Sequence, residues 1–118
     1  MYTITTNRVR DKVAFVEGAE RLVLTVDVDP FGVIGELQPI IEDLKKLNDS
    51  TPDGEILRLA TELGTRIFGA EQMTKLSEFY GNNEKQLFNV LSRYFSERLN
   101  KLIVDAQKKL GRKKLFRK

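Results

Sequence analysis

A short β-type alternation that runs directly into a helix start is the feature that most constrains the fold. Apolar side chains occupy every second position from Leu22 to Val28, and this period of two indicates a strand with one buried face. A second β-rich run, Lys12 to Glu17, precedes it, and Gly18 lies in the short connection, where it can adopt a positive φ. Because a lone hairpin is marginally stable in water, this hairpin has to pack against helices.

The residues on either side of the hairpin complete this picture. Residues 2–6 could add a third strand. Asp29 can cap a helix and Pro30 suits its first position, so the pair predicts a helix start. The following stripe predicts an amphipathic helix that ends near Asn48, kinked or split at Pro39. Its apolar positions are Phe31, Ile34, Leu37, Ile41, Leu44 and Leu47.

Two more helices follow a loop at residues 48–54 that is rich in turn-forming residues. The first has its apolar face between Ile56 and Phe68, and Gly69 is a candidate left-handed cap at its end. The second, shorter helix runs from about residue 70 to residue 80. Gly81 is expected to end it.

A long helix is predicted for residues 84–110. Asn82 or Asn83 is the expected N-cap, and Gln86 lies three residues after Asn83, where it could complete a capping box. The helix would be roughly 40 Å long at about 1.5 Å per residue. A core this small cannot cover that length, so we expect the part beyond about Leu99 to project or to pack on something else.

These elements predict an α+β protein with one domain over residues 1–110. The hairpin region takes residues 1–28, and a body of about four helices takes residues 29–110. The 118 residues suit a single domain. Residues 111–118 are predicted to form a basic, flexible tail.

The composition removes most catalytic chemistry. The chain contains no cysteine, histidine or tryptophan, so thiolate nucleophiles, sulfur-ligated metals and the commonest general base are absent. Gly32 and Gly35 lie inside the first helix and suggest close helix packing rather than a phosphate loop. We expect no enzymatic activity, no metal and no cofactor. No apolar run approaches the roughly 18 residues of a membrane span, and no signal peptide is evident, so we expect an intracellular protein.

Charge is concentrated near the C-terminus. Residues 1–92 carry 10 basic and 15 acidic side chains, whereas residues 93–118 carry 10 basic and 2 acidic ones. A basic segment of this kind either contacts nucleic acid or an acidic protein face, or remains a solvated tail. The candidate electrostatic contacts are Arg98, Lys101, Lys108, Lys109, Arg112, Lys113, Lys114, Arg117 and Lys118.

The same region supplies the candidate apolar contacts. Tyr94 and Phe95 would either pack in the core or stack on bases. Leu115 and Phe116, within a charged segment, have the character of a small docking anchor. The candidate partner-binding residues are Tyr94, Phe95, Leu99, Leu102, Ile103, Ala106, Leu110, Leu115 and Phe116.

Three segments together suggest a family. Residues 67–72 read Ile-Phe-Gly-Ala-Glu-Gln, Leu76 and Phe79-Tyr80-Gly81 follow, and the last helix ends in Ile-Val-Asp-Ala-Gln-Lys-Lys at 103–109. This pattern resembles tail assembly chaperones of long-tailed phages and prophages of Gram-positive bacteria. Their sequences often carry an FGxEQ…L…FY stretch and finish in an AQKK-like helix with a lysine-rich end. The resemblance is strongest over residues 55–110, and the small β segment ahead of a helical body is also similar.

The resemblance implies a non-enzymatic role in the host cytoplasm. Such chaperones bind the helical tape-measure protein, keep it soluble and promote assembly of the tail tube around it. They associate head to tail and are absent from the finished virion. In this family some chains are extended by a ribosomal frameshift, and the extension engages the tail tube protein. Lys108-Lys109 and Lys113-Lys114 would permit the A-rich slippery codons that a frameshift needs.

Two other functions stay open. The chain could be a different phage structural or connector protein, since its size and α+β character suit one equally. It could also be a small helical nucleic-acid-binding regulator that uses its basic C-terminus. The acidic remainder of the chain and the lack of a recognisable helix-turn-helix disfavour that function. Self-association is expected because the basic C-terminal helix of one copy could meet the acidic body of the next.

Overall fold

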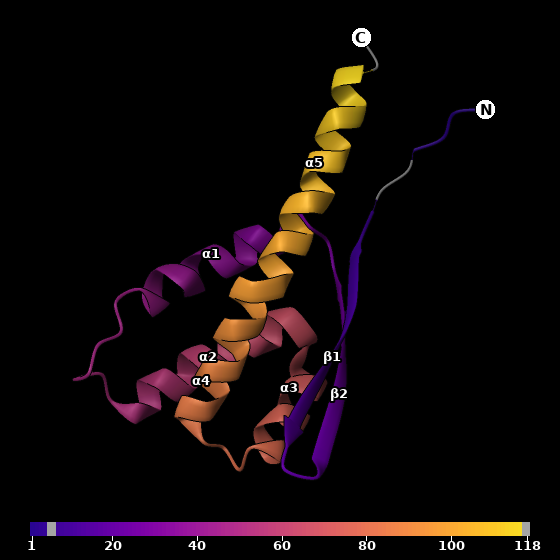
Figure 1. The fold of residues 1–118 in the computed structure, drawn as a ribbon. Helices are drawn as coiled ribbons and strands as arrows, with labels where there is room; N and C mark the ends of the chain where they lie inside the picture. The colour runs from indigo at the N-terminus through magenta and orange to yellow at the C-terminus, as the bar shows by residue number, and fades with distance from the viewer. Residues whose placement is uncertain (5–6, 117–118) are drawn as a thin grey trace.

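An N-terminal β-hairpin and a helical body make up the fold of this computed structural model (Figure 1). The structure describes residues 1–4 and 7–116, with side chains up to residue 108. The predicted α+β fold class is confirmed. The elements are β1 (Val9–Glu17), β2 (Glu20–Val28), α1 (Gly32–Leu44), α2 (Asp53–Phe68), α3 (Ala70–Phe79), α4 (Glu84–Tyr94), the π-helical turn η1 (Phe95–Leu99) and α5 (Asn100–Phe116).

The hairpin is antiparallel, and its register runs from the pair Val9–Val28 to the pair Glu17–Glu20. Gly18 has a φ of 61° and makes the tight turn. Apolar residues of β2 are buried in alternation, as the sequence predicts. Residues 1–4 form no strand, so the part of the expected third strand that the structure describes is absent, and residues 5 and 6 lie outside the described residues.

Asp29 caps α1 as expected. Its carboxylate accepts hydrogen bonds from the backbone N–H groups of Phe31 at 3.3 Å and Gly32 at 3.2 Å. The helix continues through Pro39 and is not split. The predicted apolar stripe is wrong at its first position, because Phe31 is 53% exposed while Val33 is buried.

The turns between the later helices differ in one respect from the prediction. Gly69 has φ 88° and ψ 159°, so it is extended in the glycine region and does not form a left-handed helical cap. It joins α2 to α3 without any intervening loop. Gly81 has a φ of 60° and ends α3. The Asn83 side chain accepts a hydrogen bond from the backbone N–H of Gln86 at 3.0 Å, so Asn83 and not Asn82 is the N-cap.

Helices α4 and α5 form one rod with η1 between them (Figure 1). The spacing of its buried residues is four, three, five and four, and the step of five spans the π-helical turn. The α5 backbone extends to residue 116, beyond the predicted end near 110. The buried residues of the rod are Leu87, Leu91, Tyr94, Leu99 and Ile103.

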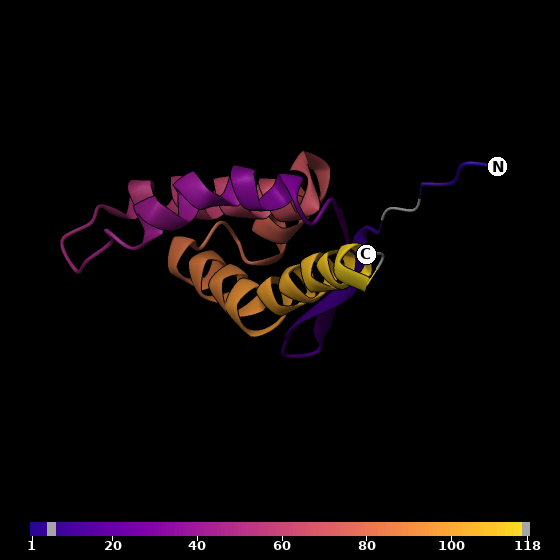
Figure 2. The ribbon, with the colours of Figure 1, turned by 90° about the horizontal axis from the view of Figure 1, so that it is seen from above.

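The core lies where the hairpin meets α2 and α4. The Phe15 and Phe68 rings meet edge to face with centroids 6.0 Å apart, and Phe68 stacks on Tyr94 at 5.8 Å. Helix α2 contacts α1, α3, α4 and β2. Viewed from above, α1 and α2 lie along one side and the α4–α5 rod along the other (Figure 2). The hairpin is therefore held by the helices, as its length requires.

At Gly64 the backbone of α2 lies close to side chains of the neighbouring helices α3 and α4. A Cβ at this position would lie 2.0 Å from Met73 Sδ and 3.3 Å from Leu91 Cδ1. The expected packing role of Gly35 is wrong, because a Cβ there would meet nothing within 4 Å. A Cβ on Gly32 would meet the Asp29 carboxylate and not another helix. Gly64 thus lets α3 and α4 approach α2.

We expect Gly64→Ala to lower the free energy of unfolding by about 1–3 kcal/mol, because Met73 and Leu91 would have to move in a packed core. Gly35→Ala is the matched control. It lies inside a helix with free space around it, and it should raise stability by about 0.5–1 kcal/mol. Urea denaturation followed by circular dichroism measures both. Equal effects of the two substitutions would contradict this packing argument.

Candidate functional site

A groove opens between the start of β1 and the middle of α5. Its volume is about 540 Å³. Half-buried Leu102 and Ala106 from α5 form its floor with Val9, which is buried in the core. The lining residues are Asn7, Arg8, Val9, Arg10, Leu102, Asp105, Ala106 and Lys108.

The rim of the groove is mostly basic. Arg8 and Arg10 stand on the strand side and Lys108 on the helix side, whereas Asp105 is the one acidic lining residue. Both arginines approach Asp27 on β2, and Arg10 Nε lies 3.5 Å from Asp27 Oδ2. The Arg8 hydrogen bond holds the pKa of Asp27 below its ordinary value. The groove can therefore accept an apolar surface whose edges are acidic.

Asp11 anchors β1 to the residues that precede α5. Arg98 donates two hydrogen bonds to its carboxylate, from Nε at 2.8 Å and from Nη2 at 2.9 Å. The Tyr94 hydroxyl donates a third at 2.9 Å. The Asp11 side chain is only 9% exposed. This bidentate pair links β1 to η1 across the chain.

The ionisation of this cluster follows from its contacts. The hydrogen bonds from Arg98 hold the pKa of Asp11 below its ordinary value, against the opposing effect of burial. Burial, followed by the hydrogen bond to Asp11, raises the pKa of Tyr94. Asp11 is thus a carboxylate and Tyr94 a neutral phenol at neutral pH, which suits a structural clamp.

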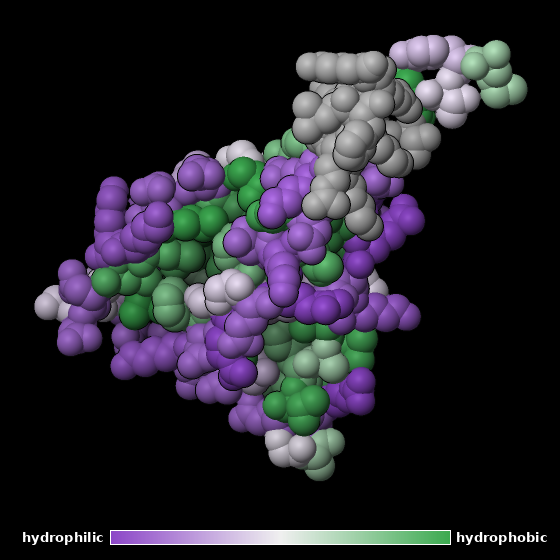
Figure 3. Space-filling view, turned by 45° about the horizontal axis from the view of Figure 1, so that its top comes forward, coloured by the Kyte–Doolittle hydropathy of each residue, from purple (hydrophilic) through white to green (hydrophobic). Residues whose placement is uncertain are grey.

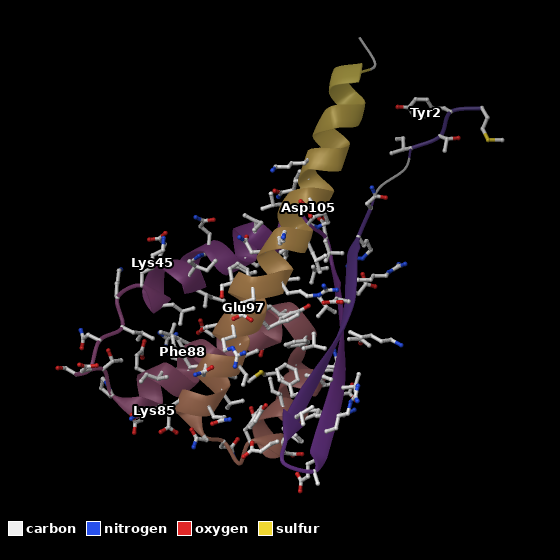
Figure 4. All side chains as sticks on the ribbon, viewed as in Figure 1. Tyr2, Lys45, Lys85, Phe88, Glu97 and Asp105 are labelled. Atoms are coloured by element: carbon white, nitrogen blue, oxygen red, sulfur yellow. The ribbon has the colours of Figure 1, made fainter. Side chains whose placement is uncertain are left out.

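A second contact holds α5 to the start of α1. The Gln107 side chain donates a hydrogen bond from Nε2 to the Pro30 carbonyl at 3.0 Å. Figure 4 shows Asp105 on α5, two residues before Gln107 in the sequence. Polar contacts therefore hold the C-terminal rod at two points, at Arg98 in η1 and at Gln107 in α5.

The structure divides the predicted apolar residues into three groups. Tyr94, Leu99 and Ile103 are buried and pack this chain's own core, which corrects their assignment to a partner-binding face. Phe95, Leu102 and Ala106 are half-buried beside the core, and the last two line the groove. Leu110, Leu115 and Phe116 lie outside the described side chains.

The predicted cations divide in a similar way. Arg98 is paired with Asp11 inside the chain while its side chain is 59% exposed, and its electrostatic contact with a partner stays a prediction. Lys108 lines the groove, whereas Lys101 is exposed and does not line it. The side chains that lie outside the described part are those of Lys109, Arg112, Lys113, Lys114, Arg117 and Lys118.

Sequence reasoning missed the strand side of the groove. Arg8 precedes β1, and Arg10 and Lys12 follow it at every second position within the strand. This period of two places basic side chains on one face. This alternation is the sequence signal from which the strand side of the groove could have been predicted. What the sequence does not show is that β1 lies beside α5, nearly a hundred residues later.

Residues 1–4 and 7–108 contain no group of three or more side chains arranged to hold a metal ion. Within the helices that the structure describes, none is both long enough and apolar enough to cross a membrane. No protein family model, curated protein or solved structure matches this chain.

The cluster of Asp11, Arg98 and Tyr94 predicts that the free energy of unfolding depends on pH. Asp11→Asn should lower the free energy of unfolding at pH 7 by about 1–3 kcal/mol, because Arg98 and Tyr94 lose a charged acceptor. The pKa of Asp11 is lower in the folded chain than in the unfolded one. Its stabilisation is therefore full above the unfolded pKa of about 3.9 and is lost as the pH falls through the folded pKa.

Denaturation of the wild type and the variant between pH 2 and pH 7 measures this effect. The difference between the two should shrink as the pH falls below about 4. Asp43→Asn, on the exposed side of α1, is the control and should change stability little. A variant difference that stays constant over the whole pH range would contradict the role of the clamp.

Proposed function

We propose that this protein is a non-enzymatic tail assembly chaperone that binds the tape-measure protein of a long-tailed phage or prophage. It keeps this rod soluble and promotes assembly of the tail tube around it, through copies that associate head to tail. The observation that carries the proposal is the groove between β1 and α5, because it combines an apolar floor with a basic rim. The resemblance of residues 55–110 to these chaperones supplies the identity of the partner.

The groove suits a long amphipathic helix. Such a helix presents an apolar stripe flanked by charged side chains. Leu102 and Ala106 would contact the stripe, while Arg8, Arg10 and Lys108 would face acidic residues at its edges. Helix capture of this kind shields apolar surface that would otherwise aggregate. A longer form of the chain, extended by a frameshift, would engage the tail tube protein.

A small nucleic-acid-binding regulator is the second candidate, and the same basic rim favours it. The salt dependence of binding distinguishes these two candidate functions. Binding to DNA or RNA should weaken steeply between about 50 and 200 mM salt because counterions are released. Capture of an apolar helix should change far less, because burial of apolar surface is little screened by salt. A different phage structural or connector protein would show neither activity.

The test is the solubility of a co-expressed tape-measure protein. Wild-type chain should keep it in the soluble fraction. A variant with Ala106→Glu and Lys108→Glu should bind it about tenfold more weakly or worse, since it places charge on the floor and removes a cation from the rim. Pull-down and titration of a tape-measure fragment measure the loss.

Lys101→Glu is the matched control. It makes the same lysine-to-glutamate change as Lys108→Glu on the same helix, but outside the groove. It should retain nearly all of the solubilising activity. If both variants behave like the wild type, the groove does not bind the tape-measure protein. If the wild type itself fails to solubilise or bind it, the proposed function is wrong.

A further inference from the structure

The outer backbone edge of β1 has no partner near the hairpin turn. The Gln72 side chain bonds both the N–H and the carbonyl of Thr25, so these two groups of β2 point away from β1. Thr25 is paired with Lys12, and the antiparallel pattern repeats every two residues, so the backbone groups of Ala14 and Val16 point away from β2. Among the described residues, no hydrogen bond uses the backbone of Ala14 or Val16. This edge is therefore open to a further strand.

A second groove, which we call the edge groove, runs along this open edge between β1 and the α4–η1 part of the rod. Its volume is about 310 Å³. The consecutive residues 13–16 line it on the strand side, so it follows the edge of β1 and not one face of the hairpin. On the helix side, half-buried Val90 and buried Tyr94 supply apolar contact, and Arg93 and Glu97 lie 3.7 Å from each other. The lining residues are Val13, Ala14, Phe15, Val16, Tyr80, Val90, Arg93, Tyr94 and Glu97.

The strand side of the edge groove lacks the features that protect the edges of sheets. Residues 13–16 read Val-Ala-Phe-Val and contain neither a charge nor a proline. The register of β1 on β2 is unbroken, so no bulge twists the edge away. The Val16 side chain is 62% exposed although it is apolar. An edge of this kind is a template for pairing with another strand.

A strand-forming segment without a sheet precedes β1. Residues 1–4 read Met-Tyr-Thr-Ile, which are uncharged, and tyrosine, threonine and isoleucine favour strands. These residues form no strand in their own chain, and the side chains of Tyr2 and Ile4 are 88% and 72% exposed. Figure 3 shows the segment projecting from the body of the molecule at the upper right. Because Tyr2 and Ile4 are two residues apart, an extended segment turns both side chains to one face.

The segment does not reach the edge groove of its own chain. Figure 1 and Figure 2 both show it leading away from the hairpin turn, beyond the start of β1. The edge groove lies at the opposite end of β1, next to the turn. Even a tight two-residue turn at residues 7–8, directly before β1, would place Tyr2 opposite Val13 and Ile4 opposite Asp11. A strand beside Ala14 and Val16 therefore has to come from another chain.

We infer that residues 1–4 of one copy add as a strand to the β1 edge of a second copy. The backbone of the segment pairs with Ala14 and Val16, and the side chains of Tyr2 and Ile4 pack into the edge groove against Val90. Neither the segment nor residues 13–16 carry a charge, so this pairing leaves no unpaired charge buried between the two strands. The same contact gives the open edge and the exposed segment their missing partners.

The contact is heterologous, because the segment and the edge are different surfaces of the chain, so it links copies head to tail. It rests on the proposed function in that it specifies the head-to-tail association included there. The edge groove shares no lining residue with the groove between β1 and α5, so one copy can bind a neighbour and a tape-measure helix together. A chain that associates but leaves the tape-measure protein insoluble would contradict the proposed function alone. A monomeric chain that keeps it soluble would contradict this inference alone.

Sedimentation velocity of the full-length chain, over a range of concentrations, tests the donor segment. The wild type should associate. Ile4→Asp should weaken association about tenfold or more, because it places a charge in an apolar groove. Thr3→Asp is the matched control. It adds the same charge at the neighbouring position, on the face of the segment that points away from the groove, and it should associate like the wild type.

Ala14→Pro tests the acceptor edge. Proline has no N–H and is tolerated on a sheet edge where that group faces outward, so this change should block strand addition and leave the hairpin folded. Val23→Pro, at the residue paired with Ala14, makes the same change on the edge of β2 and should associate like the wild type. Circular dichroism and urea denaturation check that the variants are folded. Ile4 and Thr3 are exposed, so their two variants decide the question even if Ala14→Pro does not fold.

An equimolar mixture of Ile4→Asp and folded Ala14→Pro completes the design. The first variant keeps an open edge and the second keeps a donor segment, so the mixture should form dimers and nothing larger at a concentration where each variant alone is monomeric. The inference is overturned if the wild type stays monomeric, if Thr3→Asp weakens association as much as Ile4→Asp does, or if the mixture forms no dimer. It is also overturned if Ala14→Pro abolishes association and Ile4→Asp does not, because the β1 edges of two copies would then pair with each other.

Discussion

The inner face of the hairpin has to be buried, and most of the structure follows from that requirement. Two strands cannot bury it against each other, so the helices supply the cover. Phe15 meets Phe68 of α2 and Tyr80 after α3 edge to face. The Gln72 side chain also bonds both the backbone N–H and the carbonyl of Thr25, which ties α3 to β2. The same contacts fix where the start of β1 and the hairpin tip lie. The groove at the start of β1 is thus positioned by the core.

The π-helical turn decides which part of the C-terminal rod serves the fold and which part faces outward. A regular helix would carry its buried stripe from Tyr94 by steps of three or four. The inserted residue instead brings Leu99 and Ile103 into the core. It also sets Arg98 against Asp11. Leu102 and Ala106 are left at the edge of the core, where they line the groove. Leu99 and Ile103 are therefore buried in the core and do not contact a partner at the groove.

The sequence predicts what is local and misses what depends on distant contacts. The alternation of β2, the Asp29 cap and the Asn83 cap need only neighbouring residues, and all three are confirmed. The packing of Gly64 depends on Met73 and Leu91, which approach it only in the fold. At the site, helical periodicity finds the α5 side of the groove. Helical periodicity could not find the arginines at the start of the hairpin. It also could not show that Tyr94, Leu99 and Ile103 pack in the chain's own core, because their burial depends on a π-helical turn that has no sequence signal.

Electrostatics gives the groove a role that its apolar floor alone would not have. Cations from the first strand and from the last helix face one another across it, and Asp27 and Asp105 offset them only in part. This arrangement leaves a net positive charge at the groove, which attracts an acidic partner. Long-range attraction speeds the encounter and weakens with salt, whereas contact with Leu102 and Ala106 is little affected by salt. A partner that carries both acidic edges and an apolar stripe gains from both effects. A simple polyanion gains only from the first, so it should be the more easily displaced as the salt concentration rises.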